Sequence, residues 1–208
     1  MEQKHVHDIY QEIATEFHHT RFARWPCVKN FLSSLNPYSV VGDIGSGNGK
    51  YLNFRKDLIM MGTDISQNLL EIAKCSGRDV INANGTHLPF KSGCMDGIIS
   101  IAVLHHLTNE CDRLKFIQEL VRVLKIGGRG FVTVWALEQE NLEKTINKWS
   151  SIGNNDYLVP WKNRTACRYY HLFSKDEITN LFGMISEIKI NQIQYEKSNW
   201  YVEFDKLF

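Results

Sequence analysis

The sequence predicts an α/β fold built on a doubly wound, mostly parallel, seven-stranded sheet, with an antiparallel hairpin at one edge and an additional N-terminal helix. Three observations favour this fold. Short apolar runs alternate with helical patterns between Val40 and Trp135, which is typical of right-handed crossovers. A glycine-rich loop, residues 43–49, follows the first apolar run. Two late apolar runs have no long helix between them. We expect residues 1–208 to form a single domain.

The N-terminal region predicts an amphipathic helix, because apolar side chains recur there at helical spacing. These side chains are Val6, Ile9, Tyr10, Ile13 and Phe17. The helix should end before the segment HHTRFARWP, where Pro26 permits a new helix to start.

The seven expected strands are short and mostly apolar. They occupy residues 39–45, 57–64, 79–84, 95–103, 131–136, 185–190 and 199–204. Ser66 is a suitable N-cap for a helix over residues 67–74, and Ser174 with Glu177 predicts a capping box. A stripe of apolar residues from Leu114 to Leu124 predicts a helix, and residues 125–130 read as a turn. Residues 135–169 are the least regular part, and we expect a loop with short helical pieces there.

The composition is that of an ordinary globular protein. Lys plus Arg number 24 and Asp plus Glu number 23, which gives a formal net charge of +1. Any nucleic-acid partner must therefore be held by a local patch or with help from another protein. Five cysteines without a C-x-x-C pair make a disulfide framework or a metal site improbable and favour a reducing compartment. The polar N-terminus predicts no signal peptide, and no apolar run is long enough to span a membrane.

The glycine-rich loop carries the first functional indication. Gly45, Gly47 and Gly49 follow an acid, Asp43, in the stretch DIGSGNG. In a doubly wound sheet this loop lies at the carboxyl edge, where ligands bind. The spacing differs from the dinucleotide fingerprint, and Asp43 would repel a phosphate but suits an ammonium group.

A second acid, Asp64, ends the next strand, where a carboxylate can accept from two ribose hydroxyls. This combination favours an adenosine that carries a cation, which describes S-adenosylmethionine. The alternative is a glycine-rich turn with two capping aspartates. The residues expected to bind the cofactor are Asp43, Gly45, Ser46, Gly47, Asn48, Gly49, Asp64, Ile65, Asn84, Gly85 and Ala102.

At a finer level the chain resembles the eukaryotic tRNA wobble-uridine carboxymethyl methyltransferases, a family of Rossmann-like class I methyltransferases. The resemblance rests on segments spread over nearly the whole chain. They are HVHDIYQEIATEFHHTRFARWP, GSGNGKYL, GTDIS, LPFKSGCMD, SIAVLHHL, WALEQE, VPW and RYYHLF. It implies methyl transfer from S-adenosylmethionine to the carboxylate of 5-carboxymethyluridine at the wobble position of tRNA, which gives the methyl ester.

The chain departs from the family pattern in two places. Asn84-Gly85 stands where relatives carry Asp-Gly. We expect Asn84 to accept the adenine amino group through its amide oxygen. The region after WALEQE is short, and it lacks a long basic insertion that would contribute RNA affinity.

Three residues are candidates for catalysis. A carboxylate is ionised at neutral pH and needs no general base. The main task of the enzyme is therefore to hold the carboxylate in line with the methyl group. Arg21 lies in the family-specific segment and is the expected carboxylate ligand. His105 and His106 follow the fourth strand and are expected to hydrogen-bond the substrate or close the pocket. The alternatives are a surface arginine and structural histidines.

Further residues are expected on the substrate side of the pocket. Tyr10 and Trp25 are candidates to stack on bases, with core packing as the alternative. Trp135, Arg168 and His171 complete this group.

The runner-up function is a small-molecule methyltransferase of the quinone or sterol type, and the third is a non-catalytic cofactor-binding subunit. The resemblance also implies a small zinc-binding activator protein that pairs with an edge strand. The candidate is the third strand, residues 79–83, because it should lie at the open edge of the sheet. We expect no membrane association and a cytoplasmic location, with the nucleus as the alternative.

Overall fold

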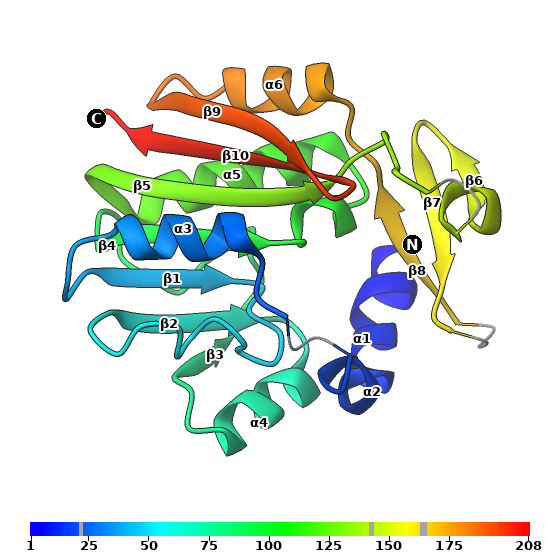
Figure 1. Cartoon of the computed structure of the whole chain (residues 1–208), viewed down its shortest axis with the longest axis horizontal. Coiled ribbons are helices and arrows are strands. Elements are labelled where there is room, and N and C mark those ends of the chain that lie inside the picture. The colour runs from blue at the N-terminus through cyan, green and yellow to red at the C-terminus, as the bar shows by residue number, and fades with distance from the viewer. Residues whose placement is uncertain (21–22, 142–143, 163–165) are drawn as a thin grey trace.

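The structure is a computed structural model, and it describes residues 1–20, 23–141, 144–162 and 166–208. Its main body is a seven-stranded sheet with the order β3-β2-β1-β4-β5-β10-β9 (Figure 1). The sheet strands are β1 (Val40–Ile44), β2 (Ile59–Asp64), β3 (Val80–Asn82), β4 (Met95–Ile101), β5 (Leu124–Trp135), β9 (Ile188–Glu196) and β10 (Asn199–Lys206). Strands β1 to β5 pair in parallel, and β10 pairs antiparallel with both β5 and β9. The expected fold class is confirmed.

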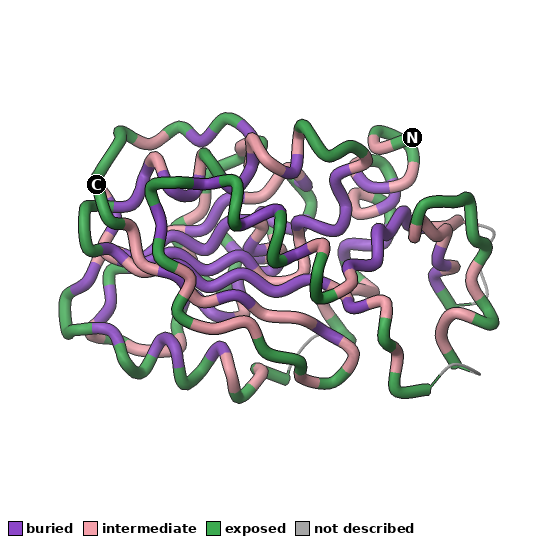
Figure 2. Tube along the Cα trace, turned by 90° about the horizontal axis from the view of Figure 1, so that it is seen from above, coloured by how far each residue is buried: buried purple, intermediate pink, exposed green. Residues whose placement is uncertain are grey.

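Helices cover both faces of this sheet. They are α3 (Pro26–Ser34), α4 (Gln67–Cys75), α5 (Glu110–Val123) and α6 (Lys175–Gly183). Phe31 and Leu32 of α3 pack with Val41, Ile99 and other strand residues in one apolar cluster. The apolar sides of α5 and α6 pack together in a second, larger cluster with β4, β5 and β10. Figure 2 shows the buried residues gathered along the central strands.

The predicted helix caps are present. The Ser66 hydroxyl accepts from the Leu69 amide at the start of α4, at 3.4 Å. The Ser174 hydroxyl accepts from the Glu177 amide at the start of α6, at 3.2 Å. Each cap satisfies one amide that the first turn of a helix leaves without an intrahelical partner.

The expected N-terminal helix is divided. A wide-turned helical segment, Gln3–Asp8, leads into α1 (Ile9–Glu12) and then α2 (Ala14–His18). The break falls at Ile13, whose φ of −90° and ψ of 3° depart from helical values. Ile13 is fully buried, so the bend lets both halves turn apolar side chains toward the same interior.

The expectation of a loop with short helical pieces at residues 135–169 was wrong. The segment forms a second sheet from β6 (Ser150–Gly153), β7 (Asp156–Pro160) and β8 (Cys167–His171), after a short 3₁₀ turn at Ile146–Lys148. This small sheet lies with α1 and α2 beside the carboxyl ends of the parallel strands (Figure 1).

The expected turn at residues 125–130 was also wrong. These residues belong to β5, which begins directly after α5 at Leu124. The strand accommodates Gly127 at a φ of +75°, and its register to β4 shifts between Met95 and Gly97. A bulge of this kind lets a strand continue through a sequence that otherwise reads as a turn. No helix within the described ranges has the length and apolar character needed to cross a membrane.

Candidate active site

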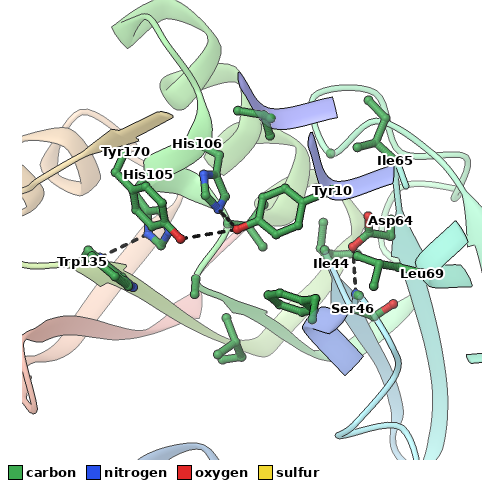
Figure 3. Close-up of a pocket in the computed structure, with 18 of the residues that line it drawn as sticks. Tyr10, Ile44, Ser46, Asp64, Ile65, Leu69, His105, His106, Trp135 and Tyr170 are labelled. Atoms are coloured by element: carbon green, nitrogen blue, oxygen red, sulfur yellow. Dashed lines mark hydrogen bonds between the residues drawn. The ribbon is translucent and has the colours of Figure 1, made fainter. Parts of the chain in front are cut away.

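A cavity of about 530 Å³ opens at the carboxyl ends of the parallel strands. Its floor is the glycine-rich loop and the ends of β1, β2 and β4, and its roof comes from the N-terminal helices and β8 (Figure 3). This is where a doubly wound sheet places its ligands. All of the expected cofactor residues except Gly49, and part of the expected substrate residues, therefore share one cavity.

The glycine-rich loop needs its glycines for two different reasons. Gly45, Gly47 and Gly49 all have positive φ values, of 79°, 55° and 72°, a region that L side chains rarely adopt. Gly45 and Gly47 line the cavity, but Gly49 does not. A Cβ on Gly49 would crowd Arg78, Ala73 and Leu52 at 3.1–3.2 Å. Gly49 therefore serves the turn and its packing, and its expected contact with cofactor finds no support.

Asp64 fixes the loop to the next helix. One carboxylate oxygen accepts from the Gly47 amide at 2.8 Å, and the other accepts from the Ser66 amide at 2.8 Å. Burial raises the pKa of Asp64, and these amides oppose that effect. Asp64 and its neighbour Ile65 both line the cavity, so the carboxylate joins two ligand-facing segments.

Asp43 is a buried acid with an unused oxygen. Its Oδ2 has no hydrogen-bond partner among the described residues, and the side chain is 2% exposed. Burial raises its pKa to about 7, while Lys50 opposes this shift and Asp64 adds to it. The hydroxyl of Ser46 is likewise buried without a partner. Unpaired buried polar groups are costly, so this end of the cavity fits a ligand that brings hydrogen-bond donors and positive charge.

The expected role of the Asn84 oxygen needs correction. Its Oδ1 accepts from the Thr86 amide at 2.9 Å and from the Thr86 hydroxyl at 3.0 Å. Both lone pairs are thereby used, and the amide nitrogen is the group left for a ligand. Asn84 lines the cavity together with Gly85, Asn48 and Ala102. A Cβ on Gly85 would lie 2.2 Å from the Phe116 ring, so only glycine fits there.

Ala102 marks the point where β4 leaves the sheet. It has a φ of +61°, which is rare for a residue with a side chain. Its amide donates to the Thr133 hydroxyl at 2.9 Å, which holds this backbone in place. The chain then turns into the short 3₁₀ segment Leu104–His106, which delivers both histidines to the cavity wall.

The two histidines are held in opposite tautomers. The Trp135 amide donates to His105 Nδ1 at 3.2 Å, so His105 carries its proton on Nε2. His106 Nδ1 lies 2.8 Å from the Tyr169 carbonyl oxygen, which can only accept, so His106 carries its proton on Nδ1. His106 Nε2 then accepts from the Tyr10 hydroxyl at 3.0 Å (Figure 3).

Both imidazoles are neutral and only weakly basic. Burial lowers the pKa of His106 to about 3, despite the hydrogen bond to the Tyr169 carbonyl. Burial, together with the nearby His106 and Arg168, moves the pKa of His105 well below its usual value. His105 Nε2 has no partner among the described residues. His105 is therefore a fixed hydrogen-bond donor on the cavity wall and a poor general base.

Aromatic rings form the rest of this end of the cavity. Tyr10, Trp25 and Trp135 line it as expected, and Tyr170 joins them. The Tyr170 ring stacks on His105 with centroids 4.9 Å apart and lies 4.4 Å from the Trp135 ring. The Tyr10 and Tyr170 hydroxyl oxygens are 3.4 Å apart. Flat apolar walls with a few fixed polar groups suit a planar ligand such as a nucleobase.

Two other predicted residues, Arg168 and His171, do not line the cavity. Arg21 lies outside the described residues, so its role stays a prediction. Arg168 is buried behind the wall, with its guanidinium over the Tyr170 ring at 5.1 Å. His171 places its two ring nitrogens 2.6 Å from Asp156 and 2.5 Å from Glu177. The expected contact of His171 with substrate finds no support, because both nitrogens are occupied in joining β7, β8 and α6.

Several lining residues were not anticipated. Phe17 and Tyr170 lie in segments that the sequence had indicated, but their individual positions depend on the packing of α2 and β8. Lys197 and Ser198 line the cavity from the tight β9–β10 turn, where both have positive φ values. The expected antiparallel hairpin was the available sequence signal for these two residues, because it places its turn at the carboxyl edge of the sheet.

The fold and the glycine-rich loop after β1 define the chain as a class I methyltransferase. Residues 42–132 match the family model described as a methyltransferase domain. The chain belongs to the tRNA (carboxymethyluridine(34)-5-O)-methyltransferase family. It is 38% identical over 227 residues to the enzyme of that name from Schizosaccharomyces pombe, covering 99% of this chain and 97% of the relative. It is 45% identical over 161 residues to the one from Arabidopsis thaliana, covering 77% of this chain and 39% of the relative.

The extent of the match differs between relatives. A Xenopus tropicalis member of the family is 32% identical over 261 residues, and the chain spans 41% of its length. The fold is also shared with a SAM-dependent methyltransferase from Methanosarcina mazei (TM-score 0.74, 19% identity, 89% of this chain and 99% of that one). A chain in the complex between the Haloferax volcanii Trm112 methyltransferase activator and a methyltransferase is similar too (TM-score 0.74, 15% identity, 98% of each chain).

Proposed function

We propose that this chain transfers a methyl group from S-adenosylmethionine to the carboxylate of 5-carboxymethyluridine at the tRNA wobble position. The observation that carries the proposal is a single cavity whose two ends differ in chemistry. One end has an unpaired buried acid beside a glycine loop, and the other has aromatic walls with two neutral histidines. The similarity to the Schizosaccharomyces pombe enzyme over nearly its full length supports the same reaction.

The cofactor end fits S-adenosylmethionine. Asp43 offers its free oxygen to the ammonium group, and Asp64 offers its carboxylate to the ribose hydroxyls. The Asn84 side chain faces the adenine position with its amide nitrogen. When bound, the cofactor supplies an electrophilic methyl group.

The chain's own residues position the acceptor and exclude water. A carboxylate is already ionised at neutral pH, so a carboxylate oxygen attacks the methyl carbon without losing a proton first. This agrees with histidines that are poor bases. His105 donates from Nε2, and Trp135 and Tyr170 pack around the uracil. We propose that Arg21 binds the carboxylate, because two N–H groups of a guanidinium match the two carboxylate oxygens. Alignment and desolvation then supply most of the rate enhancement.

A direct test uses tRNA from a strain that lacks this activity. The protein is incubated with that tRNA and S-adenosylmethionine carrying a tritiated methyl group, and the nucleosides are separated. We expect label in the methyl ester of carboxymethyluridine. Label in a different nucleoside, or in a small quinone or sterol acceptor but not in tRNA, would refute the proposal.

We also propose that a small zinc-binding activator protein pairs with β3. This strand has three residues and pairs only with β2 within the described sheet. Ile81 is 37% exposed on it, and an unpaired edge with an exposed apolar residue is a site for strand addition. The fold similarity to a chain from an activator complex is consistent with this arrangement.

A further inference from the structure

Arg168 is a buried cation with no counter-ion in the part of the chain that the structure describes. It is 5% exposed, and its Nε and Nη1 have no hydrogen-bond partner among the described residues. No carboxylate of a described residue forms an ion pair with it. Arg113, which is equally buried, differs in this respect: its guanidinium lies 3.9 Å from Asp156 and 3.8 Å from Glu177. Described carboxylates compensate the charge of Arg113, but none compensates that of Arg168.

Aromatic faces provide the immediate surroundings of Arg168. Its guanidinium carbon lies 4.8 Å from the centre of the Trp161 ring and 5.1 Å from that of Tyr170. Such contacts favour a cation, but they do not neutralise its charge. A buried charge without a counter-ion is expensive, so its retention favours an interaction with a negative group that the described residues do not supply.

The charge lies directly behind the aromatic end of the cavity. Tyr10 and Tyr170 line the cavity. Arg168 forms a side-chain hydrogen bond with Tyr10 and interacts electrostatically with both tyrosines. Burial raises the pKa of Tyr10, so its hydroxyl stays protonated and adds no negative charge. His105 and His106 are neutral. Arg168 is thus an uncompensated buried charge behind this wall among the described residues, and it contributes a positive potential to that end of the cavity.

We infer that Arg168 is the buried counter-charge that selects an anionic acceptor group at the aromatic end of the cavity. The inference rests on the proposed function, in which that group is the carboxylate of carboxymethyluridine. Arg168 acts through the Tyr10–Tyr170 wall and is a positioning residue. The charge favours a carboxylate over the neutral carbamoyl group of the same shape, because electrostatic interactions are strong in a site of low dielectric constant.

The test compares two anticodon stem-loops that differ only in the wobble side chain, carboxymethyluridine or carbamoylmethyluridine. Their affinities are measured with S-adenosylhomocysteine present, so that no methyl transfer occurs. We expect the wild-type protein to prefer the carboxymethyl RNA. We expect Arg168→Gln to lower that preference at least tenfold and Arg168→Lys to retain much of it. Lys162→Gln is the control, because Lys162 lies over the same Trp161 ring at 5.7 Å but is exposed and paired with Glu16.

The ratio of the two RNA affinities separates a loss of selectivity from a loss of protein stability, because a partly unfolded sample loses affinity for both RNAs equally. An unchanged ratio in Arg168→Gln would overturn the inference. Equal affinity of the wild-type protein for the two RNAs would overturn it without any variant, which covers the case in which Arg168→Gln does not fold. Methyl transfer to the carboxymethyl RNA by wild-type protein tests the proposed function separately, so the two failures are distinguishable.

Discussion

At the residue scale, Asp43 links ligand binding to stability. Its pKa of about 7 compares with about 3.9 in an unfolded chain. Above pH 7 the folded protein must hold a buried ionised carboxylate, which destabilises it. Below about pH 4 the group is protonated in both states and the cost disappears.

We therefore expect Asp43→Asn to stabilise the ligand-free protein at pH 8, by on the order of 2–4 kcal/mol, and to abolish cofactor binding. The gain should shrink as the pH falls toward 4. Thermal unfolding at several pH values, paired with calorimetry, measures both effects. Equal stability of variant and wild type at pH 8 would show that the Asp43 carboxylate is not penalised by burial.

His105 provides the residue-scale test of mechanism. Because its Nδ1 accepts from the Trp135 amide, its function is to donate from Nε2. Single-turnover rates should be nearly flat from about pH 6.5 to 9, since a carboxylate acceptor is ionised throughout. His105→Asn retains a donor and should keep more activity than His105→Ala. A rate that rises with an apparent pKa near 7, and becomes flat in His105→Asn, would mean that the histidine removes a proton.

At the element scale, a polar cluster helps to hold the small sheet β6–β8 to the main body. Arg113 of α5 reaches Asp156 of β7 and Glu177 of α6, and His171 of β8 bridges the same two acids. Tyr169 also donates to Asp156 at 2.6 Å. These contacts fix β8, which carries Tyr170 into the cavity wall.

Replacing Arg113 with Met should leave this cluster without its buried cation. We expect a loss of about 3–5 kcal/mol of unfolding free energy and faster amide exchange in β6 to β8. Lys125→Met is the control, because Lys125 forms a half-exposed surface pair with Asp96 and should change stability by about 0–1 kcal/mol. Similar effects of both substitutions would argue against a buried cluster that organises the small sheet.

The same elements show which parts of the structure could be predicted from the sequence. The central strands β1 and β4 were predictable because they are buried on both faces, which requires nearly continuous apolar runs. The small sheet was not, because all four residues of β6 are exposed and carry no alternating pattern. In the site, Asp43, Asp64 and both histidines were identified from position along the sheet edge. The tautomers were not predictable, since they depend on the Trp135 amide and the Tyr169 carbonyl, which the fold brings together.

At the scale of the whole molecule, the sheet has an uncovered edge at β3, next to the strand that ends in Asp64. Pairing there with the zinc-binding activator should improve solubility and support activity. Co-expression should raise both the soluble yield and the rate of methyl transfer. An Ile81→Lys substitution on β3 should weaken the complex, because it places a charge on an exposed apolar edge position. A lone chain that is monodisperse and fully active would contradict this arrangement.

The central claim is that the methyl acceptor is a carboxylate on the wobble uridine. The most direct measurement uses two anticodon stem-loops, one with carboxymethyluridine at the wobble position and one with uridine, and S-adenosylmethionine with a tritiated methyl group. We predict label only in the carboxymethyl RNA, and we predict that mild alkali releases it as methanol, as expected for a methyl ester. Equal labelling of both RNAs, or label that resists alkali, would contradict the account.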